Sequence, residues 1–384
     1  MKVQQLQFSR EQGWISSDSD EENGKINILE KSQLTFAFGS AALISQENTY
    51  AELRQYYPHS DIILTSTAGE IYGNEVYDDT ISVISFEFQA TKTQVVSTQI
   101  ENLEESYEKG KDIISQLDLQ DLSYVMVFLE GIKVNGSNLI EGIKSGLPDG
   151  VGMSGGLAGD GANFQETFVA LNSVPGEQKN IICVGFYGNN IEIGSGSVGG
   201  WDVFGPKRLV TKSNESTVYE LDNKPILDLY ELYLGDLAQE LPGSGLLFPL
   251  AVTFKNEDIP LVRTLLSIDR DNKSVTFAGN VPQGCYAQLM KANFDRLIIG
   301  SLNAAEFSKR SIEKPQAAIL ISCIGRKLVL KQRISEEVET IQDFLGLNCL
   351  ISGFYSYGEI GPSMDIKDCQ LHNQTMTVTL ITEK

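Results

Sequence analysis

Residues 51–71 read AELRQYYPHSDIILTSTAGEI, and residues 339–362 read ETIQDFLGLNCLISGFYSYGEIGP. Each stretch begins with the apolar spacing of an amphipathic helix, continues as a short apolar strand and ends at Gly-Glu-Ile. A further apolar run precedes each stretch, LTFAFG at 34–39 and AAILISC at 317–323. The repeated order of strand, helix and strand predicts two parallel strand pairs with right-handed crossovers.

A third segment has the same order of elements. SYVMVFLEG at 123–131 is followed by a helical pattern over 136–146 and by GVGMSGGLAGDG at 150–161. This segment ends in a glycine-rich loop in place of Gly-Glu-Ile. Together the three matches predict an internal duplication.

Helical periodicity is clearest in four stretches, which are 103–117, 224–236, 292–310 and 335–346. In the first and third of these, the spacing places Leu103 and Phe294 on the inward, apolar face. Between the units, residues 164–220 alternate apolar and polar positions, as half-buried strands do.

These patterns predict an α/β fold of the mixed α+β kind. We expect two related modules of mixed β-sheet covered by helices, a pseudo-duplicated pair over 1–220 and 221–384. The acidic run SDSDEENG at 17–24 is expected in an exposed hairpin tip or loop.

Charge and composition exclude several classes of protein. The 384 residues include 30 Lys and Arg against 51 Asp and Glu, a net charge of −21. Such a surface repels phosphate backbones and anionic lipid, so neither nucleic acid nor membrane is an expected partner. The chain starts without an apolar signal sequence, and its five cysteines are scattered without a CxxC pair. Reduced thiols and a cytoplasmic location are therefore predicted.

Histidine limits the catalytic options. The chain has two, His59 and His372, so a site built from two or three histidines is excluded in practice. A Ser-His-Asp enzyme would have to use one of them.

Several motifs carry alternative interpretations. Glu70 and Glu359, at the Gly-Glu-Ile turns, can hold a ligand ammonium group or cap a turn. The backbone amides of Gly155 and Gly156 can bind an anion, or this loop packs tightly between strands. Asp160 orients a ligand amine in one interpretation and caps its turn in the other.

The remaining candidates are aromatic or charged. Trp201 forms an aromatic wall for a ligand or a core plug between the modules. At most one of Tyr355 and Tyr357 is expected to face the pocket of Glu359. Arg326 pairs with a carboxylate of the protein or of the ligand.

Six motifs occur in a distinctive order: STAGEI at 66–71, SGGLAGDG at 154–161, GGWDVFGP at 199–206, VYELDNKPILDLYELYLG at 218–235, GFYSYGEIGP at 353–362 and HNQTMTVTL at 372–380. Together they resemble the FIST family, with an N-terminal FIST module over about 30–220 and a C-terminal one from 221. One position departs from the family pattern, because Thr65 stands where members often have a cysteine.

The resemblance implies a cytoplasmic sensory protein, not an enzyme. Such a protein binds a small molecule such as an amino acid in a cleft between its modules, and signals through a partner such as a histidine kinase or a chemoreceptor. No cofactor is certain. The ligand-binding residues expected from the motifs are Ser66, Thr67, Gly69, Glu70, Gly155, Gly156, Asp160, Trp201, Arg326, Tyr355, Tyr357 and Glu359. Loops 66–71, 154–161 and 353–360 are expected to approach one shared cleft.

Two alternatives remain open. The first is a haem-based nitric-oxide sensor that regulates a histidine kinase, in which His372 is the axial ligand. The second is a hydrolase-like enzyme that uses Cys323, or Ser66 with Glu70. The sequence shows no nucleophile–base pair for the second, and a buried thiol is the ordinary role of such a cysteine.

Overall fold

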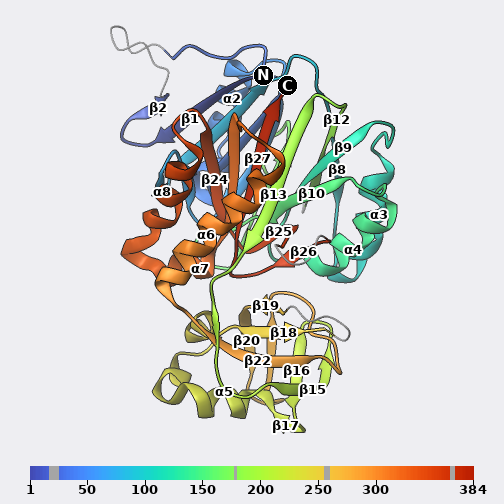
Figure 1. Ribbon diagram of the computed structural model, residues 1–384, viewed down its shortest axis with the longest axis vertical. Helices are drawn as coiled ribbons and strands as arrows, with labels where there is room; N and C mark the ends of the chain where they lie inside the picture. Colours follow the sequence, from blue (N-terminus) through green and yellow to red (C-terminus); the bar gives the residue numbers. More distant parts are fainter. Residues whose placement is uncertain (17–25, 177–179, 255–259, 364–367) are drawn as a thin grey trace.

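The computed structural model describes residues 1–16, 26–176, 180–254, 260–363 and 368–384, so the acidic run at 17–24 lies outside the described residues. Figure 1 shows a larger upper part, here called the body, and a smaller lower part, here called the lobe. The body comprises the described residues of 1–198 and 294–384, and the lobe those of 199–293.

Three six-stranded sheets build the body. The first has the order β11 (Val169–Leu171), β4 (Asp61–Thr67), β3 (Leu34–Ser40), β7 (Ile81–Glu87), β1 (Lys2–Ser9), β2 (Gly13–Ile15). The second has the order β26 (Cys369–His372), β25 (Gly358–Pro362), β10 (Gly152–Leu157), β9 (Leu122–Leu129), β12 (Asn180–Tyr187), β8 (Lys92–Gln99). The third has the order β13 (Ile191–Val198), β27 (Met376–Glu383), β23 (Ala317–Cys323), β24 (Leu350–Ser356), β5 (Glu70–Tyr72), β6 (Glu75–Tyr77).

The same unit lies at the centre of each sheet. β3 pairs in parallel with β4, β9 with β10, and β23 with β24. The first strand of each pair also takes an antiparallel neighbour, which is β7, β12 or β27. The predicted parallel pairs and the mixed α+β class are therefore confirmed, and the structure shows that the related unit occurs three times.

A short strand from each unit completes the sheet of another. β5 leaves the first unit and pairs with β24 of the third. β25 leaves the third and pairs with β10 of the second, and β11 leaves the second and pairs with β4 of the first. The exchange is cyclic, so the three units hold one another in place around a common centre.

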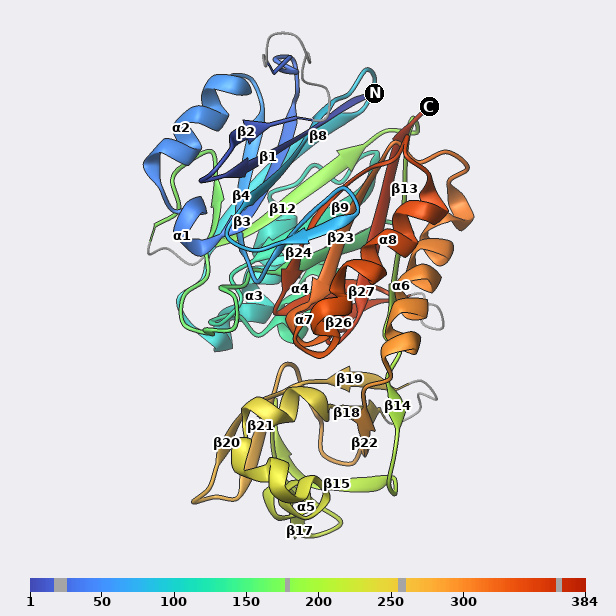
Figure 2. The same cartoon turned by 90° about the vertical axis from the view of Figure 1, so that its left-hand side faces the viewer.

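Helices cover the outer faces of the sheets (Figure 2). They are α1 (Ala41–Ile44), α2 (Glu47–Tyr56), α3 (Ser106–Ser115), α4 (Gly136–Gly146), α6 (Phe294–Ser308), α7 (Ile324–Leu330) and α8 (Ile334–Leu345). Those expected over 103–117, 292–310 and 335–346 are confirmed as α3, α6 and α8. The inward placement of Leu103 and Phe294 is wrong, because both side chains are exposed where the body faces the lobe. Among the described residues, no helix has the length and apolar character needed to cross a membrane.

The lobe is an insertion in the third unit, between β13 and β23. Its antiparallel sheet has the order β19 (Leu261–Arg263), β18 (Leu250–Thr253), β22 (Tyr286–Lys291), β15 (Arg208–Asn214), β16 (Thr217–Leu221), β21 (Ser274–Phe277), β20 (Leu265–Asp269). β14 (Asp202–Val203) joins β22, and β17 (Lys224–Pro225) joins β16. The expected helix over 224–236 is α5 (Ile226–Leu234), followed by the short helical turns η2 (Gly235–Glu240) and η3 (Gly243–Leu247). A chain division at 220/221 falls within β16, so the spatial grouping differs from two consecutive halves.

Aromatic side chains fill the centre of the body. Phe36 and Phe38 of β3, Phe128 of β9 and Phe354 of β24 come from all three units and are fully buried. The rings of Phe38 and Phe354 stack with centroids 4.9 Å apart, and those of Phe36 and Phe128 lie 5.2 Å apart. Strands covered on both faces tolerate such continuous apolar runs. The common centre is therefore a packed core.

Candidate functional site

The three predicted loops meet where the units interlock. One backbone hydrogen bond of the same kind joins each pair of loops, namely Ala68 N–H to Tyr355 O at 2.8 Å, Gly159 N–H to Ser66 O at 2.9 Å and Tyr357 N–H to Leu157 O at 3.2 Å. The loops approach one another as predicted, but they meet at a junction of paired backbones and not at the expected shared cleft. The chain itself fills the space at this junction.

Glu70 and Glu359 have matching surroundings in two of these turns. Thr67 Oγ1 and Thr80 Oγ1 donate to Glu70, and the Thr80 N–H donates to it at 3.0 Å. Ser356 Oγ donates to Glu359 at 2.7 Å, and Thr375 donates to it through its N–H at 3.1 Å and its hydroxyl at 2.9 Å.

Burial raises the pKa of both carboxyl groups, to about 7 for Glu70 and about 8 for Glu359, although the hydrogen bonds lower it in part. Each is almost completely buried and already has its polar partners. This geometry matches the interpretation in which Glu70 and Glu359 each cap a turn.

Asp160 holds the glycine-rich loop. Its carboxylate accepts the backbone N–H groups of Phe164, Gln165 and Glu166, each at 2.8 Å. The Tyr357 hydroxyl also donates to Asp160, and the Tyr357 ring stacks on Phe164 with centroids 4.4 Å apart. Asp160 thus has the geometry of a turn cap.

Gly155 and Gly156 lie inside β10, between neighbouring backbones. A Cβ on Gly155, whose φ is +153°, would stand 1.9 Å from Val127 O, and one on Gly156 would stand 2.7 Å from Ile321 Cγ2. Their positions match the interpretation of a segment packed tightly between strands.

Substituting Gly155 by alanine should therefore act on folding. Because the added Cβ cannot avoid the Val127 carbonyl, we expect a loss of roughly 1–3 kcal/mol in unfolding free energy. Urea denaturation measures this, with Gly150→Ala as the control, since Gly150 has a positive φ of +88° but nothing within 4 Å of its Cβ position. Equal losses in the two variants would show that backbone strain alone is responsible.

Arg326 is buried in a network of protein groups. Its guanidinium donates to Glu337 Oε2 from Nη2 at 2.6 Å and from Nε at 3.0 Å. Nη2 also donates to Leu297 O at 2.7 Å and to Ser301 Oγ at 2.8 Å, and Nη1 donates to Gly199 O at 3.1 Å. Arg326 was expected to pair with a carboxylate of the protein or of a ligand. In the structure its partner is Glu337, a carboxylate of the protein.

Tyr355 belongs to the same network. Its hydroxyl donates to Glu337 Oε1 at 2.7 Å, and Ser322 Oγ donates to that atom at 3.1 Å. Burial and the neighbouring Glu337 raise the pKa of Tyr355 well above its ordinary value.

Trp201 packs at the joint between body and lobe. It is buried with Met290 of the lobe and with Leu297, Val329 and Leu330 of the body. Its indole N–H donates to Gln374 O at 3.1 Å. This is the core-plug arrangement.

The first turn contains no exposed nucleophile. Ser66 Oγ accepts the Phe168 N–H at 2.8 Å, and Thr67 is held by Glu70. Gly69 faces Lys327, whose ammonium group would stand 2.3 Å from a Cβ added there. Cys323 is buried, and burial raises the pKa of its thiol far above the ordinary value. Neither Ser66 nor Cys323 has the surroundings that activate a nucleophile.

His372 lies in β26 with its ring enclosed by protein. Its Nε2 is 2.8 Å from Gly361 O, and burial lowers its pKa to about 4. Because the protein occupies Nε2, the residue as placed does not fit an axial haem ligand. In the described part of the chain, no cluster of His, Cys, Asp and Glu has the geometry of a metal site.

A large cleft opens between the body and the lobe. Its volume is about 1140 Å³. The body contributes residues from 131–136, before α4, and from 328–331, at the end of α7, together with Leu157 and Tyr357. The lobe contributes residues from 242–248 and all of 276–279. In Figures 1 and 2, this is the level at which α4, α7 and β26 face the lobe.

The position of the cleft follows from the topology. The body's wall is formed where β9, β10, β23 and β24 end, and the carboxyl ends of parallel strands are the usual place for ligands in α/β sheets. Of the predicted site residues, Tyr357 lines the cleft. Trp201 lies at the joint between body and lobe, and the others lie in the interlocked turns or in the Arg326 network.

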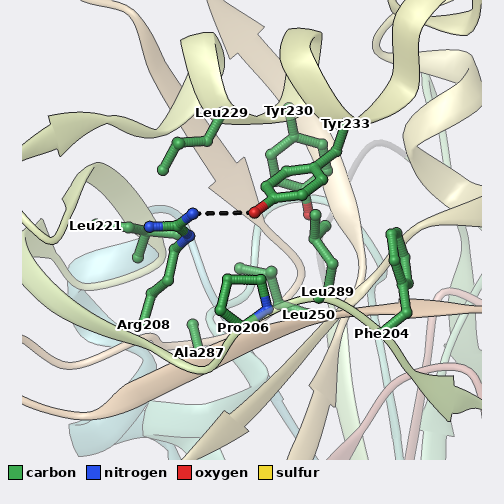
Figure 3. Close-up of a pocket in the computed structure, with 11 residues that line it drawn as sticks. Phe204, Pro206, Arg208, Leu221, Leu229, Tyr230, Tyr233, Leu250, Ala287 and Leu289 are labelled. Atoms are coloured by element: carbon green, nitrogen blue, oxygen red, sulfur yellow. Dashed lines mark hydrogen bonds between the residues drawn. The ribbon is translucent and has the colours of Figure 1, made fainter.

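A second cavity lies inside the lobe, between α5 and the sheet (Figure 3). Its lining includes Arg208, whose Nη2 donates to the Tyr233 hydroxyl at 2.9 Å, together with Phe204 and Leu289. The free volume is about 20 Å³, which is enough for about one water molecule. The interlobe cleft is therefore the better candidate for a ligand.

The fold and the cleft define a two-lobed α/β protein with a ligand-sized opening between its parts. Residues 33–224 match the FIST N domain and residues 227–362 match the FIST C domain, so the chain belongs to the FIST family. Domains of this family generally act as sensors of small ligands in signalling proteins. No curated protein matches the chain.

Similarities to solved structures are weak. A cyanuric acid hydrolase from A. caulinodans matches with 9% identity and a TM-score of 0.34, over 100% of this chain and 98% of that one. Another cyanuric acid hydrolase matches with 8% identity and a TM-score of 0.31, over 100% and 99%. PurLQS from Thermotoga maritima matches with 8% identity and a TM-score of 0.21, over 83% and 74%. These scores support no argument about activity.

Proposed function

We propose that this protein is a cytoplasmic sensor that binds a small molecule in the interlobe cleft and reports occupancy to a signalling partner, such as a histidine kinase or a chemoreceptor. The observation that carries the proposal is the cleft itself. It has the volume of a ligand site, and it is formed jointly by two parts of the chain.

Several direct hydrogen bonds connect the body and the lobe, and three of them are typical. Arg263 Nη1 donates to Leu371 O at 3.0 Å, Asn280 Nδ2 donates to Asn138 Oδ1 at 2.8 Å, and Gln374 Nε2 donates to Leu246 O at 3.2 Å. A ligand that touches both walls stabilises the arrangement in which it fits both best. Ligand binding would thus bias the position of the lobe, which a partner can detect.

The test is hydrogen exchange of the full chain, with and without a compound that raises its melting temperature in a metabolite screen. We expect slower exchange at 131–136 and 276–279, because a ligand bound between the walls covers both segments. Ser216→Trp, which adds a bulky side chain from the half-buried lining, should abolish this protection. The control is Ser173→Trp at an exposed position outside the cleft. Protection confined to another surface would contradict the proposal.

A further inference from the structure

Exposed apolar side chains converge on the interlobe cleft. Leu103 is 46% exposed, Phe164 37%, Leu266 43% and Phe294 48%, and all four line it. They come from four separate segments of the chain. Leu103 precedes α3 and Phe164 follows β10, whereas Leu266 lies in β20 and Phe294 is the first residue of α6. Exposed apolar groups that gather in one place mark a binding surface, whereas single ones are ordinary.

The buried part of the lining has the same character. Leu157 of β10 and Val329 of α7 are buried, and Leu247 of η3 is partly buried. A free amino acid would occupy a small part of about 1140 Å³, and its charged groups would face mainly hydrocarbon. The lining thus matches a molecule with a larger apolar body.

Charge distinguishes one side of the cleft. Lys291, at the end of β22, and Lys331, directly after α7, both line it beside Phe294 and Val329. Both are exposed, and within the described ranges neither forms an ion pair. Two free ammonium groups at the rim of an apolar cleft complement an anion.

The acidic lining residues belong to other elements. Glu215 lies in the turn between β15 and β16, next to Ser216, whose carbonyl accepts the Phe277 N–H. The neighbouring Asn280 binds α4, and α4 and α7 lie on different sides of the body in Figure 1. Glu240 ends η2, which packs against η3 and thereby lies toward α7. Lys291 and Lys331 together outnumber this single carboxylate, so the α7 side is the place for a negative group.

We propose that the cleft binds an apolar carboxylic acid, with its hydrocarbon body against Leu266 and Phe294 and its carboxylate at Lys291 and Lys331. This inference rests on the proposed function and specifies its ligand class. A segment of another protein is disfavoured, because the cleft is walled by both body and lobe.

The test is isothermal titration of the full chain with decanoate and, separately, with 1-decanol and leucine. We expect decanoate to bind and leucine not to bind. Phe294→Gln and Leu266→Gln should each weaken decanoate binding about tenfold or more. Both positions are exposed, so these variants should fold. Leu232→Gln and Leu347→Gln, at positions 75% and 88% exposed and outside the cleft, are the matched controls.

The charged part has its own readout. Lys291→Gln combined with Lys331→Gln should weaken decanoate binding about tenfold and leave decanol binding unchanged. Lys92→Gln, an exposed lysine outside the cleft, should change neither. Equal effects on decanoate and decanol would overturn the assignment of the carboxylate to the two lysines.

The failure of this inference can be distinguished from failure of the proposed function. If leucine or another polar metabolite binds, decanoate does not, and Ser216→Trp abolishes the binding, then the ligand class is wrong and the cleft is still the site. If decanoate binds equally well to Phe294→Gln, Leu266→Gln and Ser216→Trp, both proposals are overturned.

Discussion

Replacing Glu337 by alanine is expected to lower the free energy of unfolding by about 3–5 kcal/mol. Glu337 is the only carboxylate that the described residues bring to Arg326, and both side chains are fully buried. The substitution leaves a buried guanidinium without its counter-charge and removes the acceptor of Tyr355 and Ser322. Urea unfolding followed by fluorescence and circular dichroism measures the change.

The neighbouring residue supplies a matched control. Glu336 pairs with Arg333 at 2.8 Å, but both side chains are about two-fifths exposed. Exposed ion pairs contribute little to stability, so Glu336→Ala should shift the urea midpoint far less. Similar losses in the two variants would contradict the importance of burial. If Glu337→Ala does not fold, Arg326→Met with Glu337→Met should recover a folded protein, since it removes both charges together.

Replacing Glu359 by glutamine should stabilise the protein at alkaline pH and have little effect in acid. Burial raises the pKa of Glu359 to about 8 in the folded protein, against 4.5 as its ordinary value. Between these two pH values the folded state holds the proton that the unfolded state releases. Stability from this group is therefore complete below pH 4.5 and is lost as the pH rises to about 8.

Glutamine removes this penalty and fits the same contacts. Its Nε2 can donate to Ser356 Oγ, and its carbonyl can accept the N–H and hydroxyl of Thr375, as Glu359 does now. We expect a gain over the native protein of roughly 2–4 kcal/mol at pH 8.5, which disappears near pH 4.5. Glu70→Gln should also stabilise the protein as the pH rises, and this gain in unfolding free energy should be complete near pH 7.

The measurement is urea unfolding at a series of pH values. His372 titrates in the opposite sense, because its lowered pKa of about 4 makes the native protein gain stability as the pH rises to 6.5. Subtracting the unfolding free energy of the native protein from that of the variant at each pH removes the contribution of His372. Glu47→Gln, at an exposed position, is the control. A variant less stable than the native protein at every pH would show that Glu359 is needed as a carboxylate.

The strand–helix–strand units were predictable because their signals are local. An apolar run of seven residues such as AAILISC at 317–323, followed by a helical pattern and a second run, is contained in one stretch of chain. The unit over 123–161 was recognisable on the same basis. Its relation to the other two depends on which strand pairs with which over hundreds of residues, and local spacing does not determine this.

The candidate residues were chosen for their chemical types, and the structure explains why most of them serve the fold. Small glycines, turn carboxylates and a buried arginine are also what interlocked strands require. Gly155, Glu359 and Arg326 each satisfy a neighbouring backbone or side chain. Sequence patterns do not separate these two uses, since both place the same residue types at the ends of strands.

Two residues of the cleft follow a helical periodicity that predicts a place in the core. Leu103 and Phe294 continue the apolar face of α3 and α6, so helical periodicity assigns them to a core. The structure places them beyond that core, facing the lobe. A helix face that faces a ligand cleft has the same periodicity as one that faces a sheet.

The insertion of the lobe into one unit limits how it can move. Its incoming chain at Gly199 and Gly200 lies directly against α6, where the outgoing chain re-enters the body, and a Cβ on Gly300 would stand 1.9 Å from Gly199 O. The two covalent connections thus run side by side, and the Arg326 guanidinium binds Gly199 O at the same place. Opening of the cleft would rotate the lobe about this edge, and it would have to break the hydrogen bonds that Asn280 makes with Asn135 and Asn138 on the side of α4. A partner that reads the bound state would detect the largest displacement of the lobe on that side.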